Sequence, residues 1–222
     1  MVAITGQEQK DMPLYKRQKG LGLDVPLTVG IIGAGGVGSW VMWGFGLSGT
    51  QKIIVVDHDD VSESNLNRTP FTQLHIGQKK VLAMTELLLE RRDMKIVPIE
   101  KRIEDVPASV FADCELIVDC RDTVQPLPEE LRDAVRIIGG YNGNSITIHL
   151  NPKVGSVWST RESEGYTATP SSLLPTWGIA WIITTYILAC PNKKKEIIKT
   201  FEVSELVEQL LKVKRRKKKG GK

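Results

Sequence analysis

Residues 56–68, VDHDDVSESNLNR, bring an acid, an amide and a fixed cation close together in the sequence. Asp57 follows an apolar run, where a carboxylate can accept hydrogen bonds from ribose hydroxyl groups. Asn65 and Arg68 add an amide and a guanidinium, both of which suit phosphate oxygens. In the string GQKK, Lys80 opens an expected helix, where a second cation can face a polyphosphate. A site for a dinucleotide needs no such additional charge, so these residues favour a nucleoside triphosphate.

Two further carboxylates follow another apolar run, in the string IVDCRDT. Asp119 and Asp122 are three positions apart and are expected at the same edge of the sheet as the cations. A carboxylate that faces a triphosphate can hold magnesium, a hard cation that prefers oxygen ligands. Together with two cations, this pattern suits ATP.

A glycine-rich loop precedes all of these residues, in the string GIIGAGGVGSW. Gly33 permits a tight turn, Gly35 lets a phosphate approach the backbone, and Gly38 lets a helix and a strand pack closely, with Gly36 inside the same loop. The N–H groups of the following helix are available to an anion. With Asp57 at the end of the next strand, the pattern predicts nucleotide binding, and the loop alone leaves the nucleotide open.

The surrounding elements alternate between short apolar runs and amphipathic stretches, which is typical of a Rossmann-like, doubly wound α/β fold. Nearly all-apolar strands indicate a mostly parallel sheet that is covered on both faces. The glycines of the first helix indicate that it packs closely against a neighbour, because glycine otherwise only weakens a helix. The expected parallel strands are 26–33, 52–57, 94–100, 114–120 and 135–140. Added antiparallel strands are expected at 144–152 and 153–160, with a turn at Asn151 and Pro152.

We divide the chain into an ATP-binding domain, residues 1–190, and a C-terminal helix and basic tail, residues 191–222. The last eleven residues carry eight basic side chains and no acid. This tail is a candidate for nucleic-acid contact, although a solvated end explains it as well. The uncharged stretch 167–192 is interrupted by prolines, which favours a buried helix and no membrane span. Few, scattered cysteines and no signal-peptide pattern favour a cytoplasmic location.

The four strings GAGGVG, VDHDDVSESNLNR, GQKK and VDCRD together resemble the ubiquitin-activating-enzyme-like adenylation family, of the ThiF/MoeB/HesA type. The resemblance covers roughly residues 30–150 and follows the family's order. It implies an ATP-dependent adenylyltransferase, which activates a carboxylate as acyl-AMP and releases pyrophosphate. The implied partner is a small ubiquitin-like or sulfur-carrier protein, and the implied assembly is a homodimer.

The same resemblance implies a role for each polar residue of the strings. Asp57 binds ribose, Asn65 and Arg68 hold the phosphates, and Lys80 neutralises the leaving pyrophosphate. Asp122 carries magnesium. We expect Arg68 and Lys80 to face solvent when no nucleotide is bound.

Three features of the chain bear on the steps around and after adenylation. Arg17, in the string YKRQ, is similar to an arginine that reaches the active site of the partner subunit in the family. The chain has no CxxC pair, so we expect no structural zinc. The expected crossover loop, residues 158–172, contains no cysteine. The cysteines that exist, at positions 114, 120 and 190, lie in apolar or motif-bound stretches, so we expect all of them to be buried and no thioester to form on this chain.

Two other functions stay open at this point. Some members of the family activate a carboxylate on a modified tRNA nucleoside, which the basic tail suits. An NAD-dependent oxidoreductase would use the same glycine loop, but it leaves Arg68, Lys80 and Asp122 unexplained. A catalytically silent subunit is disfavoured by the full set of cations and acids.

Overall fold

One mixed sheet of seven strands, in the order β3-β2-β1-β4-β5-β6-β7, organises the part of the chain that the computed structural model describes. The described residues are 13–18, 20–121, 127–132, 134–153, 171–190, 195–205 and 208. The first five strands pair in parallel, and β6 and β7 add antiparallel pairs at one edge. This arrangement confirms the predicted Rossmann-like fold with added antiparallel strands. The strands are β1 (Thr28–Ile32), β2 (Lys52–Val56), β3 (Lys95–Ile99), β4 (Leu116–Asp119), β5 (Val135–Asn142), β6 (Ser145–Leu150) and β7 (Ile197–Glu202).

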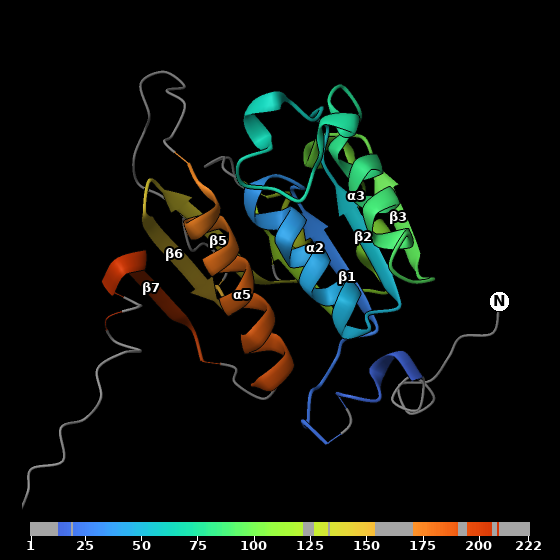
Figure 1. The fold of residues 1–222 in the computed structure, drawn as a ribbon. Helices are drawn as coiled ribbons and strands as arrows, with labels where there is room; N and C mark the ends of the chain where they lie inside the picture. Colours follow the sequence, from blue (N-terminus) through green and yellow to red (C-terminus); the bar gives the residue numbers. More distant parts are fainter. Residues whose placement is uncertain are drawn as a thin grey trace, which may run out of the picture.

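Three long helices cover one face of the sheet (Figure 1). In this view α5 lies over β5 and β6, α2 over β1, and α3 beside α2. Their apolar side chains form the main core together with β1, β2 and β6. The helices are α2 (Gly36–Ser48), α3 (Lys80–Leu89) and α5 (Leu173–Ala189).

The glycines of α2 let this helix approach both of its neighbours. A Cβ atom on Gly44 would lie 2.7 Å from Thr184 Oγ1 of α5, and one on Gly46 would lie 2.7 Å from Leu88 Cδ2 of α3. A larger residue at either position would require the facing side chain or the helix itself to shift. The close packing predicted from the glycine content is therefore confirmed.

The opposite face, which the apolar strands predicted to be covered as well, carries only short elements among the described residues. A second cluster of buried residues lies there, including Ile54, Phe111 and Leu131. The described parts of the connections that follow β3 and β4 form short helical turns that cover this core. These turns are η4 (Ile103–Asp105), η5 (Ala108–Phe111) and α4 (Glu129–Arg132).

The strand that pairs with β6 comes from a later part of the chain than we predicted. Residues 154–160, which form most of the expected strand, lie outside the described residues. The partner is instead β7, in a segment where we expected only a helix and a tail. Neighbouring lysines hide β7 in the sequence, and its exposed edge position needs few apolar side chains: only Ile197 and Phe201 are half-buried. Within the described residues, no helix is both long and apolar enough to cross a membrane.

The strand order places a topological switch point between β1 and β4. The chain passes from β1 to β2 on one side, and β4 pairs on the other side of β1. Ligands of open α/β sheets bind beyond the carboxyl ends of the strands at such a point. The glycine loop begins there, directly after β1.

We predict that burial on α5 contributes far more stability than the exposed edge of β7. Ile183 has no exposed surface, and its Cδ1 would lie 2.7 Å from a Cβ atom on Gly139 of β5. Ile183→Ala should therefore lower the free energy of unfolding by about 2–5 kcal/mol. Ile198→Ala is the matched control, because Ile198 is 59% exposed and should cost about 1 kcal/mol or less. Urea denaturation measures both values, and equal losses would contradict this packing.

Candidate nucleotide site

The glycine loop has the tight geometry that a phosphate-binding turn requires. Gly33 adopts a φ of +91°, and a Cβ atom there would lie 3.1 Å from the carbonyl oxygen of Cys120. A Cβ atom on Gly38 would lie only 1.8 Å from the carbonyl oxygen of Gly33, so helix α2 starts in direct contact with the loop. By contrast, no atom of the described residues lies within 4 Å of a Cβ atom on Gly35. Gly33 and Gly38 thus pack against protein atoms, whereas Gly35 leaves space beside the backbone of the loop.

Asp57 ties the end of β2 to this loop. Its Oδ2 accepts a hydrogen bond from the backbone N–H of Ala34 at 2.7 Å, and its Oδ1 accepts one from the N–H of Asp59 at 2.8 Å. The N–H of Gly33 in turn donates to the carbonyl of Val56 at 2.8 Å. The carboxylate is therefore fixed beside the glycine loop, where a ribose would lie in a fold of this kind.

The turn after β2 holds Arg68 next to the first turn of α2. The side chain of Asn65 accepts a hydrogen bond from the Ser62 N–H at 3.1 Å, which closes the turn η2 (Glu63–Asn65). The guanidinium of Arg68 donates to the Ser64 carbonyl and to Asn67 Oδ1. Its Nε is buried and has no hydrogen-bond partner among the described residues.

The backbone of Arg68 is held by two helices. Its carbonyl accepts hydrogen bonds from the indole Nε1 of Trp40 on α2, at 2.8 Å, and from the hydroxyl of Thr176 on α5, at 3.2 Å. Its Cδ would lie 3.6 Å from a Cβ atom on Gly36. Arg68 is therefore half-buried at the helix N-terminus, and our expectation that it faces solvent is only partly met.

Lys80 is not solvent-facing, which corrects our expectation. Its side chain is only 11% exposed, and its Nζ donates to Asp59 Oδ2 at 2.7 Å. The cause is the start of α3, where the Lys80 N–H also donates to the Asp59 carbonyl at 3.0 Å and brings the two residues together. Burial alone would raise the pKa of Asp59, but the hydrogen bond and charge of Lys80, with the charges of His58 and Arg102, lower it below its usual value. Asp59 is therefore a carboxylate at neutral pH.

Two residues that we did not predict from the sequence also border the loop. A Cβ atom on Gly36 would lie 2.8 Å from Thr176 Cγ2 and 3.3 Å from the hydroxyl oxygen of Tyr141. Tyr141 belongs to β5 and Thr176 to α5, so both come from segments far from the loop in the sequence. No local pattern relates them to it. Asp59 could have been found, because it completes an Asp-x-Asp string with Asp57.

The remaining predicted residues lie elsewhere or outside the described residues. Asp122 is outside them, so its magnesium role stays a prediction. Asp119, our alternative metal ligand, is buried and bound by Arg121, with Nε to Oδ1 and Nη2 to Oδ2 both at 3.0 Å. This guanidinium already neutralises Asp119, which therefore fits a metal ligand poorly.

Arg17 lies at the opposite end of α2 from the glycine loop. The nearby Tyr15 accepts a hydrogen bond from Arg92, which also donates to the carbonyls of Gly46 and Thr50 at 3.2 and 3.1 Å. These contacts dock the segment at the carboxyl end of α2, about 18 Å along the helix axis from its start. The exposed Arg17 follows two residues later, so it is not part of the site of its own chain.

The three cysteines are free thiols. Cys120 is buried as expected, whereas Cys114 and Cys190 are half-buried, because Cys114 precedes β4 in a loop and Cys190 follows the last turn of α5. Burial raises the pKa of Cys114 to about 11, although the charge of Lys52 opposes this shift. Burial also raises the pKa of Cys120 well above its ordinary value. Both thiols are therefore protonated at neutral pH and are poor nucleophiles.

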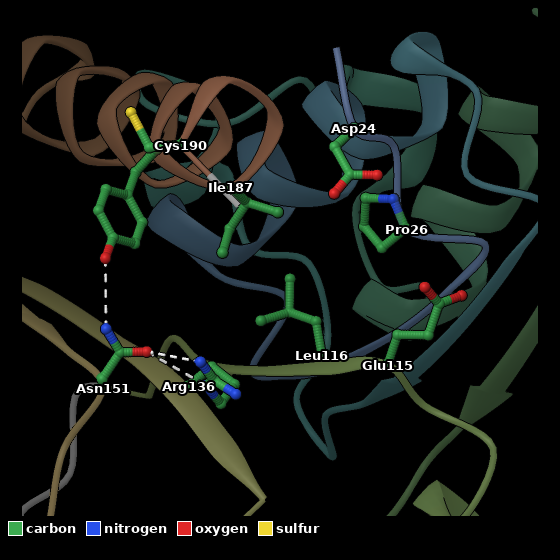
Figure 2. Close-up of a pocket in the computed structure, with 9 residues that line it drawn as sticks. Asp24, Pro26, Glu115, Leu116, Arg136, Asn151, Ile187 and Cys190 are labelled. Carbon is green, nitrogen blue, oxygen red and sulfur yellow. Dashed lines mark hydrogen bonds between the residues drawn. The ribbon is translucent and has the colours of Figure 1, made fainter. Parts of the chain in front are cut away.

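A separate pocket of about 160 Å³ lies at the other end of the sheet (Figure 2). Figure 2 shows Arg136 and Asn151 on one side of it and Asp24 and Glu115 on the other. Asn151 accepts hydrogen bonds from Arg136 Nε and Nη2 at 3.1 and 2.9 Å and donates to the hydroxyl of Tyr186 at 3.2 Å. These polar groups hold β5, β6 and α5 together. The pocket is on the amino side of the parallel strands and is distinct from the nucleotide site.

Comparison with known proteins identifies the domain that carries this geometry. The family model described as "ThiF family" matches residues 25–127, which include the glycine loop, Asp57, Arg68 and Lys80. Residues 25–127 belong to the ThiF family. The predicted relationship to the ThiF-type adenylation family is thus confirmed.

Curated relatives of the ThiF-family domain carry several different names. The chain is 31% identical over 105 residues to the tRNA threonylcarbamoyladenosine dehydratase of Bacillus subtilis, covering 44% of this chain and 40% of the relative. It is 31% identical over 97 residues to the molybdopterin-synthase adenylyltransferase of Escherichia coli, covering 42% and 39%. The catalytic subunit of the NEDD8-activating enzyme E1 of Arabidopsis thaliana is also 31% identical over 97 residues, covering 43% and 21%. Each match thus spans two fifths or less of the relative's length.

Solved structures of low sequence identity share the fold. The E. coli tRNA threonylcarbamoyladenosine dehydratase TcdA in complex with ATP has a TM-score of 0.63 at 16% identity, covering 94% of this chain and 98% of that chain. E. coli MccB with AMPCPP and MccA has a TM-score of 0.60 at 17% identity, covering 80% and 64%. At these identities the likeness supports the fold alone.

We predict opposite effects for two glycine substitutions in the loop. Gly35→Ala should leave the free energy of unfolding nearly unchanged, because its methyl group meets no atom of the described residues, but it should weaken ATP binding by occupying the open side of the loop. Gly38→Ala should destabilise the fold, because its methyl group would overlap the Gly33 carbonyl. Thermal unfolding and ATP titration distinguish the two. A stable Gly35→Ala protein that binds ATP like the wild type would exclude phosphate approach at this position.

Proposed function

We propose that this protein is an ATP-dependent adenylyltransferase that activates a carboxylate. The observation that carries the proposal is the placement of Arg68 at the N-terminus of α2, with a buried Nε and beside the open glycine loop. Helix N–H groups and a guanidinium at one point form a strong site for phosphate oxygens. The ThiF family of the domain supports the same assignment.

The chemistry of adenylation agrees with a site that is rich in cations. An oxygen of the substrate carboxylate attacks the α-phosphorus of ATP, and the bond from that phosphorus to the pyrophosphate oxygen breaks. The products are acyl-AMP and pyrophosphate. Two anions must approach each other, so the site has to supply positive charge and alignment more than proton transfer. In this proposal Asp57 binds ribose, Asn65 orders the turn that carries the phosphate ligand Arg68, and Lys80 neutralises the pyrophosphate.

Two parts of the proposal rest on the family resemblance. Asp122 would hold magnesium, and Arg17 would act in the site of a partner subunit within a homodimer. The docking of the segment near Arg17 at the far end of α2 supports a role outside its own site. A pyridine dinucleotide would leave the second cation, Lys80, without a function.

For the substrate, we propose the C-terminal carboxylate of a small ubiquitin-like or sulfur-carrier protein. The names of the NEDD8-activating enzyme and of the molybdopterin-synthase adenylyltransferase support a protein substrate. A carboxylate on a modified tRNA nucleoside is the second candidate. The tRNA dehydratase relatives and the eight basic residues at the end of the chain favour it.

Exchange of labelled pyrophosphate into ATP distinguishes the two substrates. Exchange that requires a carrier protein with a free C-terminus, and that stops when this carboxylate is amidated, supports the first candidate. Exchange that requires tRNA supports the second, and it should weaken steeply as the salt concentration rises. Failure of the protein to bind ATP at all would reject both.

We predict that Arg68→Ala abolishes pyrophosphate exchange and leaves the fold intact. Among the described residues, the side chain of Arg68 donates only to its own turn, at Ser64 and Asn67, so its loss should cost little stability. Arg91→Ala is the control. Arg91 is exposed, lies just beyond the end of α3 and packs over the ring of Trp43. It should exchange like the wild type. Full exchange by a folded Arg68→Ala protein would remove Arg68 from the site.

We also predict that no thioester forms between this chain and its substrate. Cys114 and Cys120 are protonated at neutral pH, since their pKa values lie above the ordinary range and the thiolate forms only as the pH rises through the raised values. Intact-mass spectrometry of the wild type with ATP and a carrier protein should show no thiol-sensitive adduct. An adduct that disappears in Cys190→Ser would contradict the prediction and identify Cys190 as the nucleophile.

A further inference from the structure

The cation assigned to pyrophosphate already has a partner within the chain. Lys80 Nζ lies 2.7 Å from Asp59 Oδ2, and the exposed fractions of the two side chains are 11% and 51%. A mostly buried ammonium is costly without a nearby negative charge. Asp59 supplies that charge, and its own carboxylate is about half exposed.

Backbone hydrogen bonds fix Asp59 in this position. Its N–H donates to Asp57 Oδ1 at 2.8 Å, and its carbonyl accepts from the Lys80 N–H at 3.0 Å. Asp59 thereby connects Asp57, the proposed ribose ligand, to Lys80, the proposed pyrophosphate ligand. His58 Nε2 lies 3.3 Å from Asp59 Oδ1, so both carboxylate oxygens of Asp59 have a nearby partner.

We propose that Asp59 is a positioning residue that holds Lys80 as an internal counter-ion until the triphosphate of ATP takes its place. The proposal rests on the proposed adenylation function. A triphosphate that reaches Lys80 must compete with Asp59 for the ammonium and also approach its negative charge. Asp59 therefore lowers the affinity for ATP, and it should have little effect on AMP, which lacks the β- and γ-phosphates. After catalysis, the same carboxylate recaptures Lys80 and favours release of pyrophosphate.

A neighbouring ion pair provides a matched control. Lys79 Nζ lies 2.8 Å from Asp60 Oδ1, and the two exposed fractions are 34% and 56%. The pair joins the same two segments, through an isolated bridge between Asp60 and Lys79. Its lysine is more exposed, and such surface pairs contribute little to stability. Asp60→Asn removes the same charge as Asp59→Asn, from the adjacent residue, without touching Lys80.

The effect of Asp59 on the affinity for ATP has to be distinguished from metal binding. The ligand atoms of Asp57, His58 and Asp59 lie within 4.8 Å of one another, but Asp59 Oδ2 is bound to Lys80 and both oxygens of Asp57 accept backbone hydrogen bonds. The cluster is therefore explained without an ion. Titrations in EDTA isolate the competition between Asp59 and the triphosphate from any metal.

The test compares the affinities of Asp59→Asn and Asp60→Asn for ATP and AMP in EDTA by isothermal titration calorimetry. Asp59→Asn should bind ATP about threefold to tenfold more tightly than the wild type, with unchanged affinity for AMP. Asp60→Asn should change neither affinity. Equal effects of the two substitutions, an equal shift for ATP and AMP, or weaker ATP binding by Asp59→Asn would overturn the proposal.

A second background shows whether the effect acts through Lys80. In Lys80→Met, no ammonium is left to compete for, so the additional Asp59→Asn change should raise the affinity for ATP clearly less than it does in the wild type, and an equal or larger gain would indicate general electrostatics and reject the counter-ion role. If Asp59→Asn does not fold, Asp59→Ser serves in the same assays, since its small side chain admits water to the ammonium. A wild-type protein that binds no ATP with or without magnesium would reject the adenylation function itself. Normal ATP binding with equivalent Asp59 and Asp60 variants would reject only the role of Asp59.

Discussion

The contact between Gly38 and the carbonyl of Gly33 is the constraint on which the rest of the site depends. No Cβ atom can occupy Gly38, because it would lie 1.8 Å from that oxygen. The contact brings the first turn of α2 against the end of β1, so that its N–H groups point to the carboxyl edge of the sheet. Asp57 then completes the loop through the N–H of Ala34. This backbone geometry suits a phosphate group before any charged side chain is considered.

The charged side chains around this loop have ionic or hydrogen-bonding partners within the chain. Lys80 is paired with Asp59, and the Arg68 guanidinium is directed to the Ser64 carbonyl and Asn67. Asp119, at the end of β4, is neutralised by Arg121 two residues later. Unpaired buried charges would destabilise the fold, so these cations near the loop have local acceptors. A triphosphate that binds these cations would have to displace these acceptors.

The sequence allowed the loop, the parallel strands and the turn with Arg68 to be predicted, because each is encoded within a short stretch. Gly33, Gly38 and Asp57 belong to one strand–helix–strand unit with fixed spacing. The burial of Lys80 could not be predicted in the same way, since it depends on how the start of α3 approaches Asp59. Strand β7 was missed because an edge strand needs few apolar residues. Thr176 and Tyr141 were missed because only the tertiary fold brings them to Gly36.

Tyr141 and Thr176 lie outside the region that matches the family model. The family match stops at residue 127, yet Tyr141 of β5 and Thr176 of α5 border the glycine loop. Thr176 also donates to the carbonyl of Arg68, so a helix outside the matched region fixes the backbone of a residue inside it. Strand β5 and helix α5 thus border the glycine loop from outside the matched region.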